Sequence, residues 1–336
     1  MAPYYKHTLF FLLYLIADGL SSTYLKTSRL QTPNASSDAE LLKNALDSSH
    51  TSAIVSILTN RSYDQRLDIA LQFKLKYGKI LEKELETHVE DKEVRNLLVA
   101  LVLPIPVFYA RQLHEAVAGF GTNENILIDI LCTLSSNEIW SVNKTYELEF
   151  HQQLVNDIKG DTSGDFRHLL ISLLTVRRDE GRTVHDVQAV ADARKLHGAG
   201  VGRIGTDESV FYEILCSRSY YHLREVFDEY KDLSGHEIED AIAKEFSGDA
   251  KNGLLALVAT TRNLPEYFAK RLDKWMSGAD KGSGQLTRIV VARSGVDMDD
   301  IKREYITVYH VPLQSDIFAH TEGLYTDALF NLIGLY

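Results

Sequence analysis

Hydrophobic residues recur along most of the chain at intervals of three and four, which is the spacing of one face of an α-helix. One such series runs Ile126, Ile130, Leu131 and Leu134, and another runs Phe211, Ile214, Leu215 and then Leu223, Val226, Phe227 and Tyr230. Alternation with a period of two, typical of strands, is absent. The pattern predicts an all-α protein.

The helical segments belong to an internal repeat. Gly119 to Glu124, followed by Ile-Leu-Cys at 130–132, returns 84 residues later as Arg203 to Glu208, followed by Ile-Leu-Cys at 214–216. Two further copies are marked by the steps Leu134-Ser135 and Arg218-Ser219, which recur as Arg61-Ser62 and Arg293-Ser294. Each copy ends in an apolar block, at 97–101, 169–173, 254–258 and 329–333. Four repeats of one helical unit are therefore expected.

The repeats give the expected domain organisation. Prolines at the junctions place repeat 1 at 36–103, repeat 2 at 107–178, repeat 3 at 189–263 and repeat 4 at 264–336. The charged segment 179–188 is interpreted as a linker that joins two pairs of copies. Residues 23–35 are polar and are expected to form a flexible arm.

The amino terminus has the features of a secretory signal peptide. Lys6 precedes the apolar run Leu9 to Ala17, and small residues follow at Ala17, Gly19 and Ser21. The run is too short to span a bilayer, which takes about 20 residues. We expect residues 1–22 to be a signal and the protein to be secreted. The alternative is a cytoplasmic protein, peripheral on membranes, with an amino-terminal extension.

Charge narrows the range of partners. The chain has 336 residues, 36 of them Lys or Arg and 47 Asp or Glu, for a net charge of −11. Such a balance argues against a basic surface for nucleic acid or for direct attraction to anionic lipid. An acidic partner therefore needs a bridging cation or a local basic patch. Cys132 and Cys216 are too few for a disulfide framework.

A glycine-rich loop in two of the repeats has the composition of a calcium site. Thr122 of Gly119-Phe120-Gly121-Thr122 precedes Asp161 by 39 residues, and Thr206 precedes Glu245 by the same number. Glycine permits positive φ, so successive carbonyl oxygens can turn toward one cation, while the Thr hydroxyl is expected to cap the following helix. Three carbonyls and a bidentate carboxylate leave about two of the six to eight calcium positions open. A simple turn beside a solvated carboxylate is the alternative.

With the paired loops and the four copies, the chain resembles the annexin family from about residue 36 to 336. The resemblance implies four repeats of about five helices each in a curved disc, with calcium loops that dock on acidic phospholipid. It implies calcium ligands from the carbonyls of Val117, Gly119 and Gly121 with the Asp161 carboxylate. In repeat 3 it implies the carbonyls of Val201, Arg203 and Gly205 with Glu245. Glu124 and Glu208 match positions of a weaker accessory ion, although a favourable charge at a helix start is the preferred explanation.

Repeats 1 and 4 depart from this pattern. Repeat 1 has Asp47-Ser48-Ser49 in place of the glycine loop, with His88 at the acid position. Repeat 4 has Asp280-Lys281 in place of Gly-Thr, with His320 at the acid position. Imidazole is a poor ligand for a cation that prefers oxygen, so neither repeat is expected to bind calcium well.

The expected function is calcium-dependent binding to acidic phospholipid membranes through the loops of repeats 2 and 3. No enzymatic activity, small-molecule substrate or nucleic-acid partner is expected. The sequence Gly200 to Gly205 spells a dinucleotide-binding pattern, but no strand precedes it. The alternative function is a secreted helical scaffold or effector that binds a protein partner, with calcium incidental.

The signal peptide generates the first prediction. Expressed in a secreting eukaryotic host, the chain should appear in the medium with a new amino terminus after Gly19 or Ser21, because small residues precede signal peptidase cleavage. Amino-terminal sequencing of the purified protein checks this. An intact Met1 on protein recovered only from the cytosol would contradict it.

Overall fold

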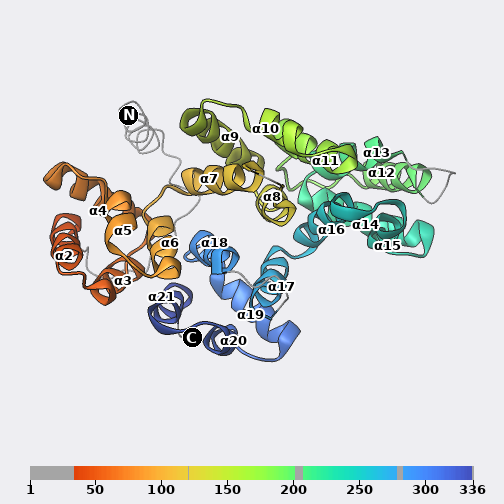
Figure 1. Cartoon of the computed structure of the whole chain (residues 1–336). Helices are drawn as coiled ribbons and strands as arrows, with labels where there is room; N and C mark the ends of the chain where they lie inside the picture. The colour runs from red at the N-terminus through yellow and green to blue at the C-terminus, as the bar shows by residue number, and fades with distance from the viewer. Residues whose placement is uncertain (1–33, 120, 201–206, 278–282, 335–336) are drawn as a thin grey trace. The chain divides into compact units, whose positions relative to one another are not determined.

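The computed structural model describes residues 34–119, 121–200, 207–277 and 283–334, and in these residues the chain is all helical (Figure 1). The expected all-α fold is confirmed, with five helices in each repeat. Repeat 1 contains α2 (Ala35–Asp47), α3 (Thr51–Thr59), α4 (Tyr63–Tyr77), α5 (Leu81–His88) and α6 (Lys92–Leu101). Repeat 2 contains α7 (Ile105–Val117), α8 (Glu124–Leu131), α9 (Ser136–Phe150), α10 (Leu154–Asp161) and α11 (Gly164–Thr175). Repeat 3 contains α12 (Asp186–Ala199), α13 (Glu208–Ser217), α14 (Tyr220–Ser234), α15 (Ile238–Glu245) and α16 (Gly248–Arg262). Repeat 4 contains α17 (Leu264–Ser277), α18 (Ser283–Arg293), α19 (Met298–Tyr309), α20 (Leu313–His320) and α21 (Gly323–Ile333).

The serine of the repeated two-residue step starts the third helix in three of the repeats. Ser62, Ser135 and Ser219 are the N-caps of α4, α9 and α14, and each side chain accepts a hydrogen bond from a first-turn amide. In repeat 4 the third helix begins later, at Met298, with Asp297 at its N-cap position. Ser294 therefore stays in the connection between helices.

The chain folds as two compact units. Of the described residues, unit 1 contains 34–108, 268–277 and 283–334, and unit 2 contains 109–119, 121–200 and 207–267. Repeat 1 thus pairs with repeat 4, and repeat 2 pairs with repeat 3. The repeats that share a unit are not the ones expected from a linker between two consecutive pairs.

Unit 2 is held by the apolar blocks that end its two repeats. In the pairing of α11 with α16, a Cβ placed on Gly253 would lie only 2.6 Å from Cδ2 of Leu169. Real Cβ atoms do not approach so closely, so glycine is required for the helices to reach this separation. The hydroxyl of Thr260 also donates to the carbonyl of Cys132 at 3.2 Å.

Unit 1 is built on the same principle from the first and last repeats. Helix α6 packs against α18, and α21 packs against both α3 and α6. Leu97, Leu98 and Leu329 of the terminal apolar blocks are completely buried. The Nδ2 of Asn331 donates to the Thr59 hydroxyl at 2.9 Å, which joins residues far apart in the sequence.

The segment 179–188, which was expected to be a linker, begins with a bond to unit 2. The Arg178 side chain, which immediately precedes it, is buried and donates to the carbonyls of Arg218 and Leu215. The amide of Asp179 donates to the carbonyl of Ser217 at 2.8 Å. These bonds satisfy carbonyls at the end of α13, for which the helix itself provides no N–H donor.

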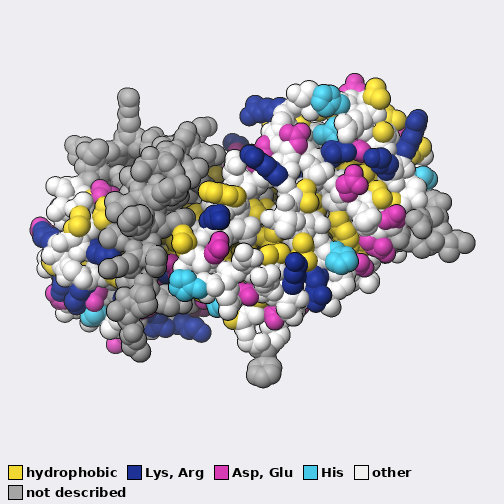
Figure 2. Space-filling model, turned by 90° about the horizontal axis from the view of Figure 1, so that it is seen from above, with side chains coloured by type: hydrophobic (Ala, Val, Ile, Leu, Met, Phe, Trp, Pro, Cys, Tyr) yellow, Lys and Arg dark blue, Asp and Glu magenta, His cyan; other side chains and the backbone are white. Residues whose placement is uncertain are grey.

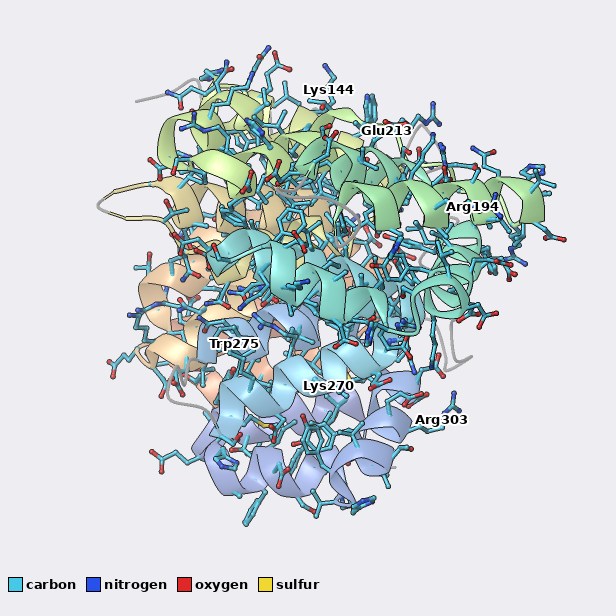
Figure 3. All side chains as sticks on the ribbon, turned by 90° about the vertical axis from the view of Figure 1, so that its right-hand side faces the viewer. Lys144, Arg194, Glu213, Lys270, Trp275 and Arg303 are labelled. Atoms are coloured by element: carbon cyan, nitrogen blue, oxygen red, sulfur yellow. The ribbon has the colours of Figure 1, made fainter. Side chains whose placement is uncertain are left out.

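Charged side chains of both signs lie on the exposed surface of both units, together with exposed apolar side chains such as Trp140 and Phe318. Lys144, Arg194, Glu213 and Arg303 project outward from their helices, whereas Trp275 is only 3% exposed (Figure 3). Lys, Arg, Asp and Glu side chains are interspersed on the face shown in Figure 2. Among the described residues no helix is both long enough and apolar enough to cross a bilayer. The expected signal and arm at 1–33 lie outside the described residues.

A buried carboxylate in unit 2 connects three helices. Asp192 of α12 is 1% exposed and accepts from Nε of Arg218 at 2.7 Å and from Nη2 at 3.3 Å. His222 of α14 places Nε2 at 3.3 Å from the same carboxylate. Burial alone raises the pKa of Asp192, but the hydrogen bonds and charges of Arg218 and then His222 outweigh it and lower this pKa.

The lowered pKa of Asp192 generates the second prediction. Asp192→Asn should reduce the free energy of unfolding by about 2 kcal/mol at pH 7, because it leaves Arg218 without its partner charge. The native pKa lies below the unfolded value of about 3.9, so this stabilisation is complete above about pH 5 and is lost as the pH falls through the native pKa. Urea denaturation of wild type and variant from pH 7 to pH 3 checks it.

The exposed Asp228 of the same unit supplies the control. Asp228→Asn should leave the denaturation midpoint unchanged. If the difference in the free energy of unfolding between wild type and Asp192→Asn stays constant down to pH 3, the ion pair is not the cause of the destabilisation.

Candidate calcium-binding loops

The loop of repeat 2 lies between α7 and α8 and has the backbone conformation that its glycines were expected to provide. Gly119 has φ of +104° and Gly121 has φ of +92°. The amide of Asn123 donates to the carbonyl of Ala116 at 2.8 Å and so closes the loop. Side chains other than glycine rarely adopt such φ values, so the two glycines are needed for this turn.

The carbonyl oxygens expected to bind calcium are available in this loop. Among the described residues, no hydrogen bond is made to the carbonyls of Val117, Gly119 and Gly121. Backbone carbonyls near a protein surface are usually paired or hydrated. Three acceptors without a protein partner in one short loop are therefore suited to a cation that prefers oxygen ligands.

Thr122 has a different role from the one predicted. The N-cap of α8 is Asn123, whose side chain accepts from the amide of Ile126 at 3.2 Å. The Thr122 hydroxyl instead donates to the backbone carbonyl of Asp161 at 3.0 Å. The expectation of a threonine cap was wrong because the adjacent asparagine takes that position. The hydroxyl ties the loop to the residue that carries the distant carboxylate.

Asp161 is the last residue of α10, and its side chain is exposed. Among the described residues its carboxylate makes no hydrogen bond or ion pair. It lies near Tyr146 of α9, whose pKa is raised first by burial, then by a hydrogen bond to Asp157, and then by the charges of Asp157 and Asp161. The structure thus brings a free carboxylate to the loop that contains the free carbonyls.

The corresponding acidic residue of repeat 3 lies beside Gly200, the last described residue before its loop. Glu245 is the last residue of α15, and a Cβ placed on Gly200 would lie 3.4 Å from its Cγ. Burial and then the charge of Glu245 raise the pKa of Tyr230, which is the counterpart of Tyr146. The predicted carbonyl ligands Val201, Arg203 and Gly205 lie outside the described residues.

The loop of repeat 3 is one residue longer than that of repeat 2. Its closing bond runs from the amide of Asp207 to the carbonyl of Ala199 at 2.8 Å and so spans one residue more than the Asn123–Ala116 bond. Val117 directly follows Ala116, the acceptor of the closing bond in repeat 2. The residue that directly follows the acceptor Ala199 in repeat 3 is Gly200. Sequence reasoning missed Gly200. The sequence does show this difference, because Thr206 follows Ala199 by one residue more than Thr122 follows Ala116.

Repeats 1 and 4 differ at the equivalent places. In repeat 1 the amide of His50 donates to the carbonyl of Ala45 at 2.8 Å, so the loop is two residues shorter than in repeat 2. The His88 and His320 rings each place Nδ1 at 2.8 Å from a carbonyl one turn earlier, of Glu84 and Asp316 respectively. Gly278, Asp280 and Lys281 of the repeat 4 loop lie outside the described residues.

The chemistry of the repeat 2 loop is that of a site built from the backbone. The described residues contain no group of three or more His, Cys, Asp or Glu side chains that would hold a metal. One carboxylate and several carbonyls favour calcium over zinc or copper, which take nitrogen and sulfur ligands. Such a site depends on loop conformation more than on side-chain identity.

Comparisons with known proteins agree on one family. The family model described as Annexin matches residues 37–101, 108–173, 191–257 and 267–332. Annexin A11 of Oryctolagus cuniculus is 42% identical over 299 residues, which cover 88% of this chain and 59% of that protein. The solved structure of annexin III has a TM-score of 0.88 at 38% identity and covers 92% of this chain and 96% of that one. The calcium-bound structure of annexin (Sm)1 has a TM-score of 0.81 at 27% identity, with 93% of each chain covered.

The positive φ values generate the third prediction. Gly121→Ala should reduce the free energy of unfolding by about 1–3 kcal/mol, because φ of +92° strains any residue with a Cβ even where space is free. Gly160→Ala, in α10 beside Asp161, should instead stabilise the protein by about 0.5–1 kcal/mol, since this helical glycine also has free space. Thermal denaturation of both variants checks the pair, and equal shifts in one direction would contradict it.

Proposed function

This chain belongs to the annexin family, a family of calcium-dependent phospholipid-binding proteins, and from that membership we propose that it binds acidic phospholipid through the loops of repeats 2 and 3. The single observation that carries the assignment to these loops is the juxtaposition in repeat 2. There, three unpartnered carbonyls stand in a loop that Thr122 ties to Asp161, and the carboxylate of Asp161 is itself unpartnered.

The residues of repeat 2 fit calcium. The proposed ligands are the carbonyls of Val117, Gly119 and Gly121 and both oxygens of the Asp161 carboxylate. These oxygens supply five of about six to eight positions, so about two remain for water or for an oxygen from outside the protein. When bound, the ion would supply a positive charge at a surface loop of an acidic protein.

The residues of repeat 3 support a second site. The proposed ligands are the Glu245 carboxylate and the carbonyls of Val201, Arg203 and Gly205, and the register of the loop-closing bond adds the carbonyl of Gly200 as a further candidate. A carbonyl ligand does not depend on the side chain, so Arg203 in place of the first loop glycine is compatible with binding. The calcium-bound structure of annexin (Sm)1 supports calcium as the ion.

The coupling between ion and lipid follows from charge. One carboxylate offsets half of the charge of Ca²⁺, and calcium affinity falls with the number of charged ligands, so each site alone is weak. A lipid phosphate in an open position adds both a ligand and a charge. Each partner then strengthens the binding of the other, which allows a protein of net charge −11 to adhere to an anionic surface.

The lack of enzymatic activity and the secretion of the protein are also proposals. The chain spans 59% of the length of annexin A11, so the activities of that whole protein do not transfer to it. We propose a binding protein without enzymatic activity. Secretion stays a prediction that rests on the amino-terminal sequence.

Removal of the two carboxylates generates the fourth prediction. Asp161→Asn with Glu245→Gln should abolish calcium-dependent co-sedimentation with phosphatidylserine vesicles, because an amide retains the shape but not the charge or bidentate coordination of a carboxylate. The measurement compares vesicles of phosphatidylserine with vesicles of phosphatidylcholine, each with calcium and with EDTA.

The histidines at the acid positions of the other repeats supply the matched control. His88→Ala with His320→Ala should co-sediment as the wild type does. Equal losses from both double variants would refute the assignment to repeats 2 and 3. If the wild type does not pellet with vesicles in the presence of calcium but still binds a protein, the alternative function of a helical scaffold for a protein partner would be favoured.

A further inference from the structure

A cavity of about 150 Å³ lies within unit 1, between the start of α4 in repeat 1 and the connection that follows α18 in repeat 4. The residues of its wall that matter below are Arg61, Ser62, Asp64, Arg66, Ser294 and Asn331. A water molecule takes about 30 Å³ in the liquid, so the cavity has room for a few waters or for one small polyatomic ion. None of the wall residues belongs to the proposed calcium loops.

Arg66 brings a buried positive charge to this cavity. The residue is 4% exposed, and its guanidinium donates through Nε to the Leu101 carbonyl at 3.1 Å and through Nη1 to the Arg61 carbonyl at 2.8 Å. Burial lowers the pKa of Arg66 to about 10, which still leaves it protonated at neutral pH. Among the described residues it has no carboxylate partner, and Nη2 makes no hydrogen bond.

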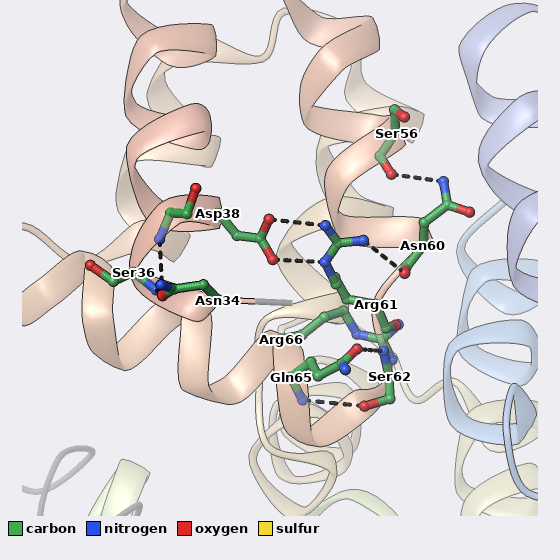
Figure 4. A network of polar contacts seen from close by, with 10 residues as sticks. Asn34, Ser36, Asp38, Ser56, Asn60, Arg61, Ser62, Gln65 and Arg66 are labelled. Carbon is green, nitrogen blue, oxygen red and sulfur yellow. Dashed lines mark hydrogen bonds and ion pairs between the residues drawn. The ribbon is translucent and has the colours of Figure 1, made fainter. Parts of the chain in front are cut away.

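The neighbouring Arg61, in contrast to Arg66, has a carboxylate partner. Arg61 donates to the two oxygens of the Asp38 carboxylate at 2.7 and 2.9 Å, so its charge is paired within repeat 1 (Figure 4). Asp64 is the acid among the described wall residues, and it is exposed, so solvent screens its charge. The charge without a counterion at this cavity is therefore that of Arg66.

Other groups on the wall favour an anion as well. Ser62 is the N-cap of the 15-residue helix α4, where its hydroxyl accepts from the Gln65 amide, and the helix dipole is positive at this end. On the opposite wall the Ser294 hydroxyl donates to the Val291 carbonyl at 3.4 Å, and the Asn331 amide has a second N–H beyond the one that it donates to Thr59.

We propose that this cavity binds a small tetrahedral oxyanion of the phosphate or sulfate class, held by Nη2 of Arg66 and by the amino-terminal end of α4. Arg66 supplies the charge, since burial makes a guanidinium without a counterion costly. The same phosphate chemistry has two sources, which are free inorganic phosphate and the monoester headgroup of phosphatidic acid. The site is independent of the calcium loops because it shares no residue with them.

The test uses the full chain in EDTA, with inorganic phosphate titrated against chloride of equal ionic strength. A saturable rise of about 2–4 °C in the melting temperature is expected at phosphate concentrations about tenfold above Kd. Ser294→Asp places a carboxylate in the cavity and should remove this rise, whereas Asp64→Asn removes the nearby acid and should shift saturation to lower phosphate. Ser56→Asp, at an exposed position of α3, carries the same added charge outside the cavity and should behave as the wild type.

A second arm separates the two sources of phosphate. Co-sedimentation with phosphatidic acid vesicles in EDTA that is lost in Ser294→Asp and kept in Ser56→Asp would support the lipid headgroup. A saturable response to inorganic phosphate with no vesicle binding would support the free ion. The proposal is overturned if phosphate stabilises wild type, Ser294→Asp and Ser56→Asp equally, since that is the general effect of an excluded salt. It is also overturned if no saturable response appears.

Discussion

The constraint on which the structure depends is that the terminal apolar block of a repeat is covered by a second repeat as well as by helices of its own. Helices α11 and α16 cover each other in unit 2, and the end of repeat 1 is covered by α18 and α21 in unit 1. An amphipathic helix needs another apolar face, and each repeat finds that face on one other repeat. The contact at Gly253 and Leu169 shows how close the approach is, since even a methyl group would not fit between them. The first repeat pairs with the last in this way, and the second pairs with the third.

Pairing leaves the loops at the helix ends free to vary, and this explains why the repeats differ in chemistry while sharing a fold. Ala45 and His50 close a short loop in repeat 1 in the same way that Ala116 and Asn123 close a longer one in repeat 2. The helices before and after are retained in both. A site made of carbonyl oxygens is gained or lost with the length and φ values of a loop, at little cost to the packed helices around it.

The sequence contained the fold class, the repeat and the location of the candidate sites, because these depend on periodicity and on exact recurrence. The offset shared by Thr122 and Thr206 with their carboxylates was sufficient to place Asp161 and Glu245 at the loops. The pairing of the repeats could not be predicted from the sequence, since the apolar blocks are alike and no local feature indicates which blocks pack together. The role of Thr122 was also missed, because Asn123 is an equally good N-cap and only three-dimensional geometry decides between them. Arg178 was placed at the end of repeat 2 without a role, although its guanidinium satisfies carbonyls at the end of α13.

The same comparison of equivalent positions explains how a buried charge without a carboxylate partner arises at Arg66. Four residues after the serine of the repeated step, Arg66 corresponds to Ile139, Leu223 and Met298, which are all buried apolar residues. An apolar residue at this position completes the core of its repeat, whereas Arg66 requires hydrogen-bond acceptors and a counter-charge. The carbonyls of Arg61 and Leu101 meet the first requirement, and the described part of the chain does not meet the second. Ser294 would close this side of unit 1 if it began a helix as its three counterparts do. Because α19 begins later, at Met298, an open cavity stands beside a buried position where the repeat has exchanged a hydrocarbon for a cation.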